Sequence, residues 1–316
     1  QNDRVGGTQA TISNVQLTIV TPATGGTNVP TLDIATGKIS VPAGTKSGTY
    51  TIGYKICAAV ASLTVCDSAT VTVVVGQASL TAVADTFTVT NGANGGAAGN
   101  VLENDKYNGT TDLRGNASVT LTWGTLPVGV VTTTNAGELK VNAGTASGTY
   151  AVTYTICEVL NNNNCSTQTA TIVVGQATLT AVGDTFTVTN GANGGSAGNV
   201  LTNDEYNSTT GLAGNASVTL TWLTVPAGIQ TATNGDLTVA AGTASGTYAV
   251  TYRLCEVLNS SNCSIATATI VVKGVVTPTV TPTVTITANA DTYTHTVSST
   301  TYTTTSNVLT NDRIGT

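Results

Sequence analysis

Two kinds of oxygen-bearing side chain recur along this sequence in a pattern that could bind a metal ion. Asp85 and Asp105 lie twenty residues apart, Asn104 stands directly before the second of them, and the same arrangement returns later in the chain. Calcium takes about six to eight oxygen ligands, several of them carboxylates. The residues of this candidate calcium site are Asp85, Asn104, Asp105, Asp184, Asn203, Asp204, Asp291, Asn311 and Asp312.

The same residues also have a purely structural interpretation. An Asn-Asp pair stabilises a turn through its side chains, and Asp85 can cap the end of a strand. Carboxylates are sparse in this chain, with 16 Asp and Glu among 316 residues. That scarcity favours the structural interpretation, and calcium stays the alternative cofactor.

The six cysteines form three close pairs. They contain no Cys-x-x-Cys motif and the chain has a single histidine, His295, which argues against zinc and thioredoxin-like sites. The alternation of residue types around each cysteine places it on an outward face, so each pair should join a hairpin on its exposed side. The predicted disulfides are Cys57–Cys66, Cys157–Cys165 and Cys255–Cys263. Disulfides indicate an oxidising, extracellular setting.

No copy of the sequence pattern carries a nucleophile with a base, or a cluster of acids suited to catalysis, so we predict that the chain is not an enzyme. Trp123 and Trp222 could stack on sugars, but Ile19 occupies the corresponding place in an earlier copy, which favours core packing. Glu158 and Glu256 follow the first cysteine of their pairs, whereas Ala58 stands at that place in the first copy. These glutamates therefore cannot belong to a site shared by all copies.

Composition excludes further classes of function. Only 8% of residues are charged, the net charge is −6, and there are ten Lys and Arg, so a phosphate-binding surface for nucleic acid is not expected. Threonine contributes 68 residues and alternates with Val, Ile and Leu, which is typical of strands. No apolar run approaches the roughly 18 residues of a membrane span. Methionine is absent, so we interpret the chain as a processed or excised piece.

An internal repeat dominates the organisation of the chain. Residues 85–123 and 184–222 are identical at 33 of 39 positions, at an offset of 99 residues. This period is too long for a solenoid unit and fits a whole domain with its own core. The predicted units are a repeat lacking its beginning (1–76), two complete repeats (77–175 and 176–274), a stiff Pro/Thr linker (275–287) and the opening of a further repeat (288–316).

Each repeat is predicted to be a β-sandwich. The second repeat shows short alternating segments at about 79–90, 118–123, 128–134, 137–143, 148–157 and 165–174. In the segment 150–156, Tyr150, Val152, Tyr154 and Ile156 share one face, as in a half-buried strand. The glycine-rich segment 91–99 has no Gly-Lys-Ser/Thr after it and is expected to be a flexible loop. The fold class is therefore all-β, with tandem Ig-like domains arranged as a rod.

Three segments of the second repeat, 100–105, 143–160 and 170–174, resemble a known family. They are similar to the tandem Ig-like (cadherin-like) repeats of very large Bacteroidota surface proteins, which include gliding-motility-associated adhesins exported by the type IX secretion system. The resemblance implies a cell-surface location and no catalytic residues. In that phylum O-glycans attach at Asp-Ser/Thr-apolar sites, which implies candidate glycosylation at Ser68, Thr86, Thr185 and Thr292.

Three hypotheses for function follow. The first is a stalk or filament region of an extracellular adhesin, whose partners are neighbouring repeats or copies of the same protein. The second is a filament subunit in which the tail of one copy, residues 288–312, completes the first repeat of another by donor-strand addition. The third is a glycan-binding module that uses its loops.

Overall fold

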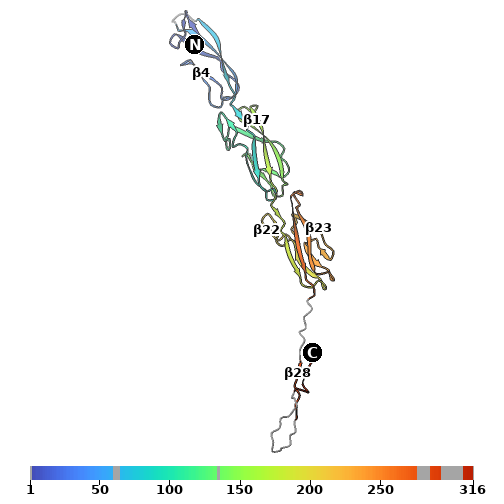
Figure 1. Cartoon of the computed structure of the whole chain (residues 1–316). Helices are drawn as coiled ribbons and strands as arrows, with labels where there is room; N and C mark the ends of the chain where they lie inside the picture. Colours follow the sequence, from blue (N-terminus) through green and yellow to red (C-terminus); the bar gives the residue numbers. More distant parts are fainter. Residues whose placement is uncertain (1, 60–64, 134–135, 276–284, 293–308, 316) are drawn as a thin grey trace, which may run out of the picture.

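The computed structural model describes the chain except for residues 1, 60–64, 134–135, 276–284, 293–308 and 316. Figure 1 shows three β-rich bodies placed end to end, with the described part of the C-terminal tail beyond the third. They correspond to the first, second and third repeats and the tail. The described residues contain no helix that could cross a membrane. The predicted all-β class with repeated sandwiches is confirmed.

The second repeat shows the complete arrangement of strands. A four-stranded sheet has the order β13-β16-β17-β9, a three-stranded sheet has the order β10-β15-β14, and a smaller one has the order β12-β11-β8. The strands are β8 (Leu80–Thr81), β9 (Asp85–Val89), β10 (Gly96–Asn100), β11 (Lys106–Tyr107), β12 (Thr110–Thr111), β13 (Val119–Trp123), β14 (Val130–Thr132), β15 (Glu138–Val141), β16 (Gly148–Glu158) and β17 (Cys165–Val174).

The alternation in β16 has the predicted consequence for the core. Val152, Tyr154 and Ile156 are completely inaccessible, and Tyr150 packs partly buried against the same cluster. Strand β9 runs parallel to β17, with Asp85 opposite Ala170, and closes the other edge of this sheet. Leu139 and Val141 from β15 complete the core from the second sheet. The long hairpin β16–β17 is thus the central element of the repeat.

The expectation of a flexible loop over residues 91–99 is wrong for its second half. Residues Gly96–Asn100 form β10, which pairs with β15 and is interrupted by a bulge between Ala97 and Gly99. A Cβ atom at Gly99 would overlap the ring of Phe87, so glycine is required for this strand to approach β9. The predicted strand over 79–90 is likewise divided, into β8 and β9.

The third repeat reproduces this architecture, with the sheet orders β19-β27-β26-β23, β20-β25-β24 and β18-β21-β22. Its strands are β18 (Leu179–Thr180), β19 (Asp184–Val188), β20 (Gly195–Asn199), β21 (Glu205–Tyr206), β22 (Thr209–Thr210), β23 (Val218–Thr224), β24 (Ile229–Thr231), β25 (Asp236–Val239), β26 (Gly246–Glu256) and β27 (Cys263–Val272). Tyr252 takes the place of Tyr154 at the centre of the core.

The described residues of the first repeat form fewer strands, and its core is more open. They are β1 (Arg4–Val5), β2 (Thr8–Gln9), β3 (Val15–Thr21), β4 (Thr31–Asp33), β5 (Lys38–Ser40), β6 (Gly48–Ala58) and β7 (Cys66–Val75). In the described residues β7 pairs only with β6, so Val71, Val73 and Val75 stay half-buried. Beside them lies a groove of about 380 Å³, lined by Leu17, Tyr54 and Val71 among others.

The tail contains a two-stranded sheet formed by β28 (Thr285–Thr287) and β29 (Arg313–Gly315). Thr287 pairs with Arg313, just as Thr81 of β8 pairs with Lys106 of β11. The tail therefore repeats, in the same register, the first strand pairing of a complete repeat. His295 and most of the predicted further repeat lie outside the described residues.

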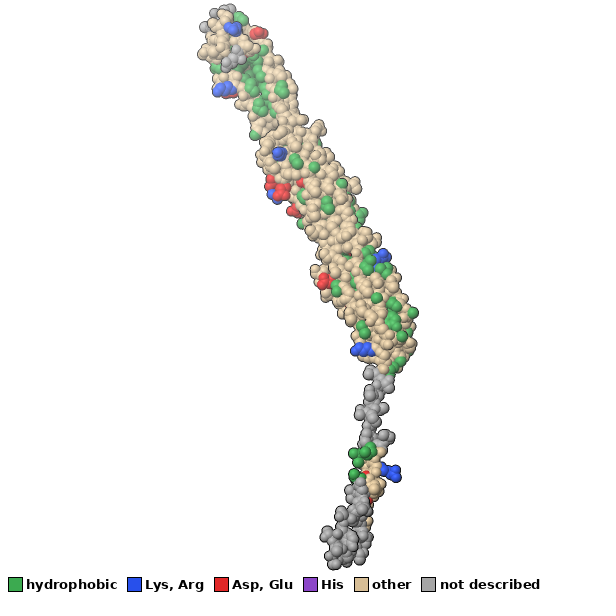
Figure 2. Space-filling model, in the orientation of Figure 1, with side chains coloured by type: hydrophobic (Ala, Val, Ile, Leu, Met, Phe, Trp, Pro, Cys, Tyr) green, Lys and Arg blue, Asp and Glu red, His purple; other side chains and the backbone are tan. Residues whose placement is uncertain are grey.

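The surface of the rod is nearly uncharged. Figure 2 shows mostly neutral polar surface, with a few scattered acidic and basic side chains on the visible face. The ion pairs formed by the described residues are both at the surface and join Arg114 to Glu103 and to Asp112. Such exposed pairs contribute little to stability, so burial and hydrogen bonds hold these repeats together.

Candidate functional site: a buried acid pair and the domain junctions

The candidate calcium residues of the second repeat meet around the hydroxyl of Tyr154. This hydroxyl lies 3.0 Å from Asp105 Oδ1, 3.3 Å from Asp85 Oδ2 and 2.8 Å from the carbonyl oxygen of Val83. Asp105 Oδ1 also accepts the backbone N–H of Val83 at 2.7 Å. Asp105 is fully buried and Asp85 is only 8% exposed. The structure therefore brings Asp85 and Asp105 together at one tyrosine hydroxyl.

Burial of two carboxylates next to each other changes their acidity. Burial first, and then the neighbouring charge of Asp105, raise the pKa of Asp85 to about 6. Burial also raises the pKa of Asp105, against the hydrogen bonds from the Val83 N–H and the Tyr154 hydroxyl. The pKa of Tyr154 is raised by burial and by the two carboxylates. Among the described residues, no neighbouring cation lowers the pKa of either Asp85 or Asp105 in opposition to burial.

Several oxygens of this cluster have no hydrogen-bond partner. They are Asn104 Oδ1 and Asp105 Oδ2 in the second repeat, and Asp184 Oδ2, Asn203 Oδ1 and Asp204 Oδ2 in the third. In the third repeat Tyr252 donates to Asp204 Oδ1 at 3.0 Å, and burial, followed by the charge of Asp204, raises the pKa of Asp184 to about 6. The described residues contain no group of three or more His, Cys, Asp or Glu placed to hold a metal.

The other predicted members of the set have different surroundings. In the first repeat Asp3 takes the place of Asp105, and its Oδ2 accepts the Tyr54 hydroxyl at 2.7 Å. In the tail Asp312 Oδ1 accepts the N–H of Asn289 at 2.7 Å, while Asp291 and Asn311 are exposed. Both aspartates and the asparagine of the candidate set therefore lie close to the central tyrosine in the second and third repeats.

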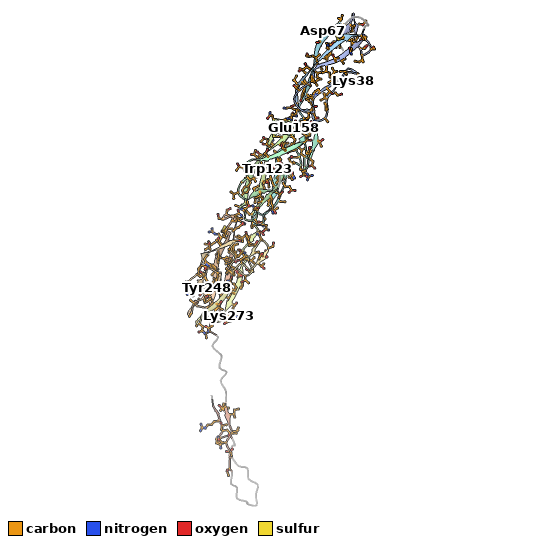
Figure 3. The ribbon with its side chains drawn as sticks, turned by 180° about the vertical axis from the view of Figure 1, so that it is seen from behind. Lys38, Asp67, Trp123, Glu158, Tyr248 and Lys273 are labelled. Carbon is orange, nitrogen blue, oxygen red and sulfur yellow. A yellow bond between two sulfur atoms is a disulfide. The ribbon has the colours of Figure 1, made fainter. Side chains whose placement is uncertain are left out.

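The glutamates set aside on sequence grounds organise the boundary between repeats. Glu158 is 2% exposed and lies at the end of β16. Its carboxylate accepts Asn161 Nδ2 and Asn164 Nδ2, both at 2.9 Å, and Asn164 Nδ2 also donates to the linker carbonyl of Ala78. In Figure 3 Glu158 lies toward the end of the second repeat that faces the first, whereas Trp123 lies further along the rod.

Asn161 carries this network across the first junction. Its Oδ1 accepts the backbone N–H of Ser47 at 2.8 Å and the Ser47 hydroxyl at 2.9 Å, and Ser47 belongs to the first repeat. Glu158 therefore fixes an asparagine that binds the preceding domain. This is a positioning role for Glu158, and it requires no catalysis.

The second junction repeats the contact to a serine and adds others, but Asn259 Nδ2 has no hydrogen-bond partner where Asn161 Nδ2 donates to Glu158. Asn259 Oδ1 accepts the N–H of Ser147 at 2.7 Å, and the fully buried Glu256 accepts Asn262 Nδ2 at 2.8 Å and the Tyr206 hydroxyl at 3.2 Å. Asn91 Nδ2 donates to Asn207 Oδ1 at 2.6 Å, and Ala93 of the second repeat packs against the core of the third. The relevant signal in the sequence was the recurrence of Glu-x-x-Asn after the first cysteine.

The three predicted disulfides are confirmed, and each joins directly opposite residues of a hairpin. In the two complete repeats the bond closes the loop that carries the junction asparagines, since Asn161 and Asn164 lie between Cys157 and Cys165. The second cysteine of every pair is exposed and the first is half-buried. The disulfide thus limits the movement of the loop that contacts the preceding repeat.

The remaining candidates separate into core and surface residues. Trp123 and Trp222 are half-buried and pack on Tyr154 and Tyr252, with ring centroids 6.1 Å apart in both pairs. The predicted core packing is confirmed, and they do not form open sugar-stacking platforms. The candidate glycosylation residues, Ser68, Thr86, Thr185 and Thr292, are all exposed.

Comparison with known proteins identifies no family. No family model matches the chain, and no curated protein matches it. Mouse Cadherin-23 EC22-24 is similar at 11% identity and a TM-score of 0.35, covering 83% of this chain and 86% of that one. Mouse clustered PcdhgC3 EC1-3 is similar at 11% identity and a TM-score of 0.35, covering 83% of this chain and 89% of that one. Drosophila N-cadherin EC1-4 is similar at 9% identity and a TM-score of 0.27, covering 82% of this chain and 67% of that one. At these scores the likeness assigns no function.

Proposed function

We propose that this chain is a spacer region of an extracellular adhesin, in which stiffly connected domains hold a binding region away from a cell surface. The observation that carries the proposal is the recurrence of one hydrogen bond across both junctions, from Ser47 to Asn161 and from Ser147 to Asn259. A repeated connection of this kind sets reach and orientation rather than chemistry.

The junction hydrogen bonds restrict bending because their partners are themselves held in place. Asn161 is fixed by Glu158 on its own domain and by the Cys157–Cys165 disulfide around its loop. The linker carbonyls of Ala78 and Ala177 accept Asn164 and Asn262, so the connecting backbone is tied to the same hairpins. Movement of one domain relative to the next therefore has to break several polar contacts at once.

An extracellular location is part of the same proposal. Three hairpin disulfides suit an oxidising compartment, and a nearly uncharged, threonine-rich surface suits a protein exposed to the outside. The resemblance noted above extends this proposal to the surface of a Bacteroidota cell, export by type IX secretion and a contribution to gliding. O-glycans at Ser68, Thr86, Thr185 and Thr292 belong to the same proposal.

Surface display and adhesion can be tested on intact source cells. We expect antibodies against the second and third repeats to label unpermeabilised cells, and cells lacking the gene to adhere less to surfaces. Cells that express the polypeptide with only these repeats deleted should still bind surfaces in bulk assays. In tethering assays, however, they should hold the surface closer to the cell. Labelling that requires permeabilisation would refute the extracellular assignment, and unchanged tether length would refute the spacer role.

A second candidate is a filament of strand-exchanged subunits, and one observation favours it. Among the described residues β7 pairs only with β6, so the edge that β9 and β19 occupy in the complete repeats is open, and the tail already repeats the β8–β11 register. A tail from a second copy would fit that edge. The denatured, reduced mass of the native polypeptide decides between the two: a mass near 31.6 kDa plus glycans favours subunits, and a mass many times larger favours a covalent string of domains.

A further inference from the structure

A strand near the beginning of each complete repeat runs parallel to the last strand of that repeat. In the second repeat β9 pairs with β17 along the whole of its length, beginning with Asp85 opposite Ala170. In the third repeat β19 pairs with β27 in the same way, beginning with Asp184 opposite Ala268. The backbone that enters a complete repeat and the backbone that leaves it therefore lie side by side and point in the same direction.

Side chains of the last hairpin extend this pairing to the segment before β9. Ser166 Oγ accepts the backbone N–H of Ala82 at 2.9 Å. Asn164 Nδ2 donates to the carbonyl oxygen of Ala78, also at 2.9 Å. The corresponding bonds of the third repeat join Ala181 to Ser264 at 2.9 Å and Ala177 to Asn262 at 2.8 Å. The entering backbone is thus tied to the leaving strand from its first residues onward.

Backbone bonds extend the pairing beyond the other end of β9. Gly175 donates its N–H to the carbonyl oxygen of Val89 at 2.8 Å and accepts the N–H of Gly92 at 3.0 Å. A Cβ atom at Gly175 would overlap the carbonyl oxygen of Thr90, so the absence of a side chain permits this close approach. In the third repeat Lys273 makes the same two bonds, to Val188 at 2.8 Å and from Gly191 at 3.0 Å.

The two ends of this parallel pair face different neighbouring repeats. Asn161, which precedes β17, contacts Ser47 of the first repeat. Asn91, which follows β9, contacts Asn207 of the third repeat. Tension along the chain therefore pulls the entering segment toward the first repeat and the leaving segment toward the third. Parallel segments pulled in this way slide past each other, so the hydrogen bonds between them are loaded together and not broken one at a time.

We propose that each complete repeat bears tension along the rod through this parallel pair, which we call the shear clamp. It consists of residues 78–92 with 164–175 in the second repeat, and of residues 177–191 with 262–273 in the third. The biological setting rests on the spacer role proposed above, because a spacer that links a cell to a bound surface transmits any pull between them. The two proposals fail separately, since the spacer depends on bending at the junctions and the clamp on resistance within a repeat.

The test is single-molecule stretching of the full chain, held at its two ends under constant force. Each complete repeat should lengthen in one step of about 30 nm, because the 99-residue period less the disulfide loop of separation 8 extends by about 3.5 Å per residue. Reducing the disulfides should add about 2.4 nm to each step, which identifies the repeat that opens. Gradual lengthening in many small steps would overturn the proposal.

Paired substitutions locate the load. Ser166→Ala with Ser264→Ala removes the oxygens that accept a backbone N–H in the two clamps, and we expect about tenfold faster unfolding at constant force. The matched control is Asn116→Ala with Asn215→Ala, whose side-chain oxygens also accept a backbone N–H at 2.9 Å but lie outside the clamps. In urea, without force, both pairs should accelerate unfolding to a similar extent. An equal response of both pairs under tension would overturn the assignment.

The direction of pulling provides a test that leaves the hydrogen bonds of the clamp intact. Thr90 and Gln176 are exposed and lie just beyond the same end of the β9–β17 pairing. Handles attached at these two positions of the full chain would peel β9 from β17 one bond at a time. We expect the second repeat to open at a lower force in this geometry than when the chain is pulled through its ends. Equal or greater resistance would contradict the proposal, because the strength would then not depend on shear.

Discussion

Replacing Asp85 with asparagine should stabilise the second repeat at neutral pH when divalent cations are removed. Asp85 is 8% exposed, and burial together with the charge of Asp105 raises its pKa from the ordinary 3.8 to about 6. A folded-state pKa above the unfolded one means that the folded state binds the proton more tightly. The contribution of Asp85 to stability is therefore most favourable below about pH 4 and is lost as the pH rises through about 6.

The size of the effect follows from this shift. Each pKa unit corresponds to about 1.4 kcal/mol, so charging Asp85 lowers the free energy of unfolding by at most about 3 kcal/mol at pH 7. Asparagine has no charge to bury, and its amide can still accept the Tyr154 hydroxyl. We therefore expect Asp85→Asn to be more stable than the parent at pH 7 by about 1–3 kcal/mol, and nearly equal to it at pH 4.

Tryptophan fluorescence makes the measurement specific to one repeat. The chain has two tryptophans, so Trp222→Phe leaves Trp123, which packs on Tyr154, as the reporter of the second repeat. Urea unfolding with a chelator present, at several pH values, gives the free energy directly. Asp112→Asn is the control, because Arg114 lowers the pKa of Asp112 and the pH dependence should have the opposite sign. Equal destabilisation by Asp85→Asn at pH 4 and pH 7 would refute this reasoning.

Two further predictions concern the framework of the repeats. Gly99→Ala should destabilise the second repeat by about 1–3 kcal/mol in urea unfolding, since its Cβ would overlap Phe87. The control is Gly76→Ala, whose Cβ meets no atom within 4 Å and should have little effect. Equal effects of the two substitutions would contradict this account of β10. Replacing Cys157 and Cys165 with alanine should cost about 2.5 kcal/mol by the loop-entropy estimate. It should also raise hydrogen exchange in the loop around Asn161, and an unchanged loop would show that the disulfide does not hold the junction.

The sequence was sufficient for the features that depend on period-2 alternation. The pattern around Tyr154 identified the buried face of β16, and the same alternation placed the cysteines opposite each other across a hairpin. These predictions succeed because side chains in a strand must alternate between core and solvent. The repeat then carried each conclusion from the second repeat to the third.

Features that depend on close backbone approach were harder to predict. Strand β10 has the sequence Gly-Ala-Ala-Gly-Asn, which lacks the β-branched residues typical of strands, and its glycines serve to accommodate Phe87. Local composition therefore indicated a loop where tertiary packing imposes a strand.

The junction residues were missed for a different reason. Glu158 and Glu256 were dismissed because Ala58 replaces them in the first repeat, but a contact between neighbouring domains need not recur in every copy. Asn161 and Asn259 also lie in asparagine- and serine-rich loops, where no single residue stands out. Their role depends on which domain lies opposite, and that information is not local.

The most direct test of the spacer account is the distribution of bending angles between adjacent repeats, measured by electron microscopy of the full chain. We predict a narrow distribution at both junctions, which broadens at the second junction when Asn207 and Asn259 are replaced by alanine. The first junction of the same molecules provides the internal control, because Ser47 and Asn161 are unchanged. A broad distribution in the parent chain, or one unaffected by these substitutions, would contradict the claim that the asparagine contacts make this chain a stiff spacer.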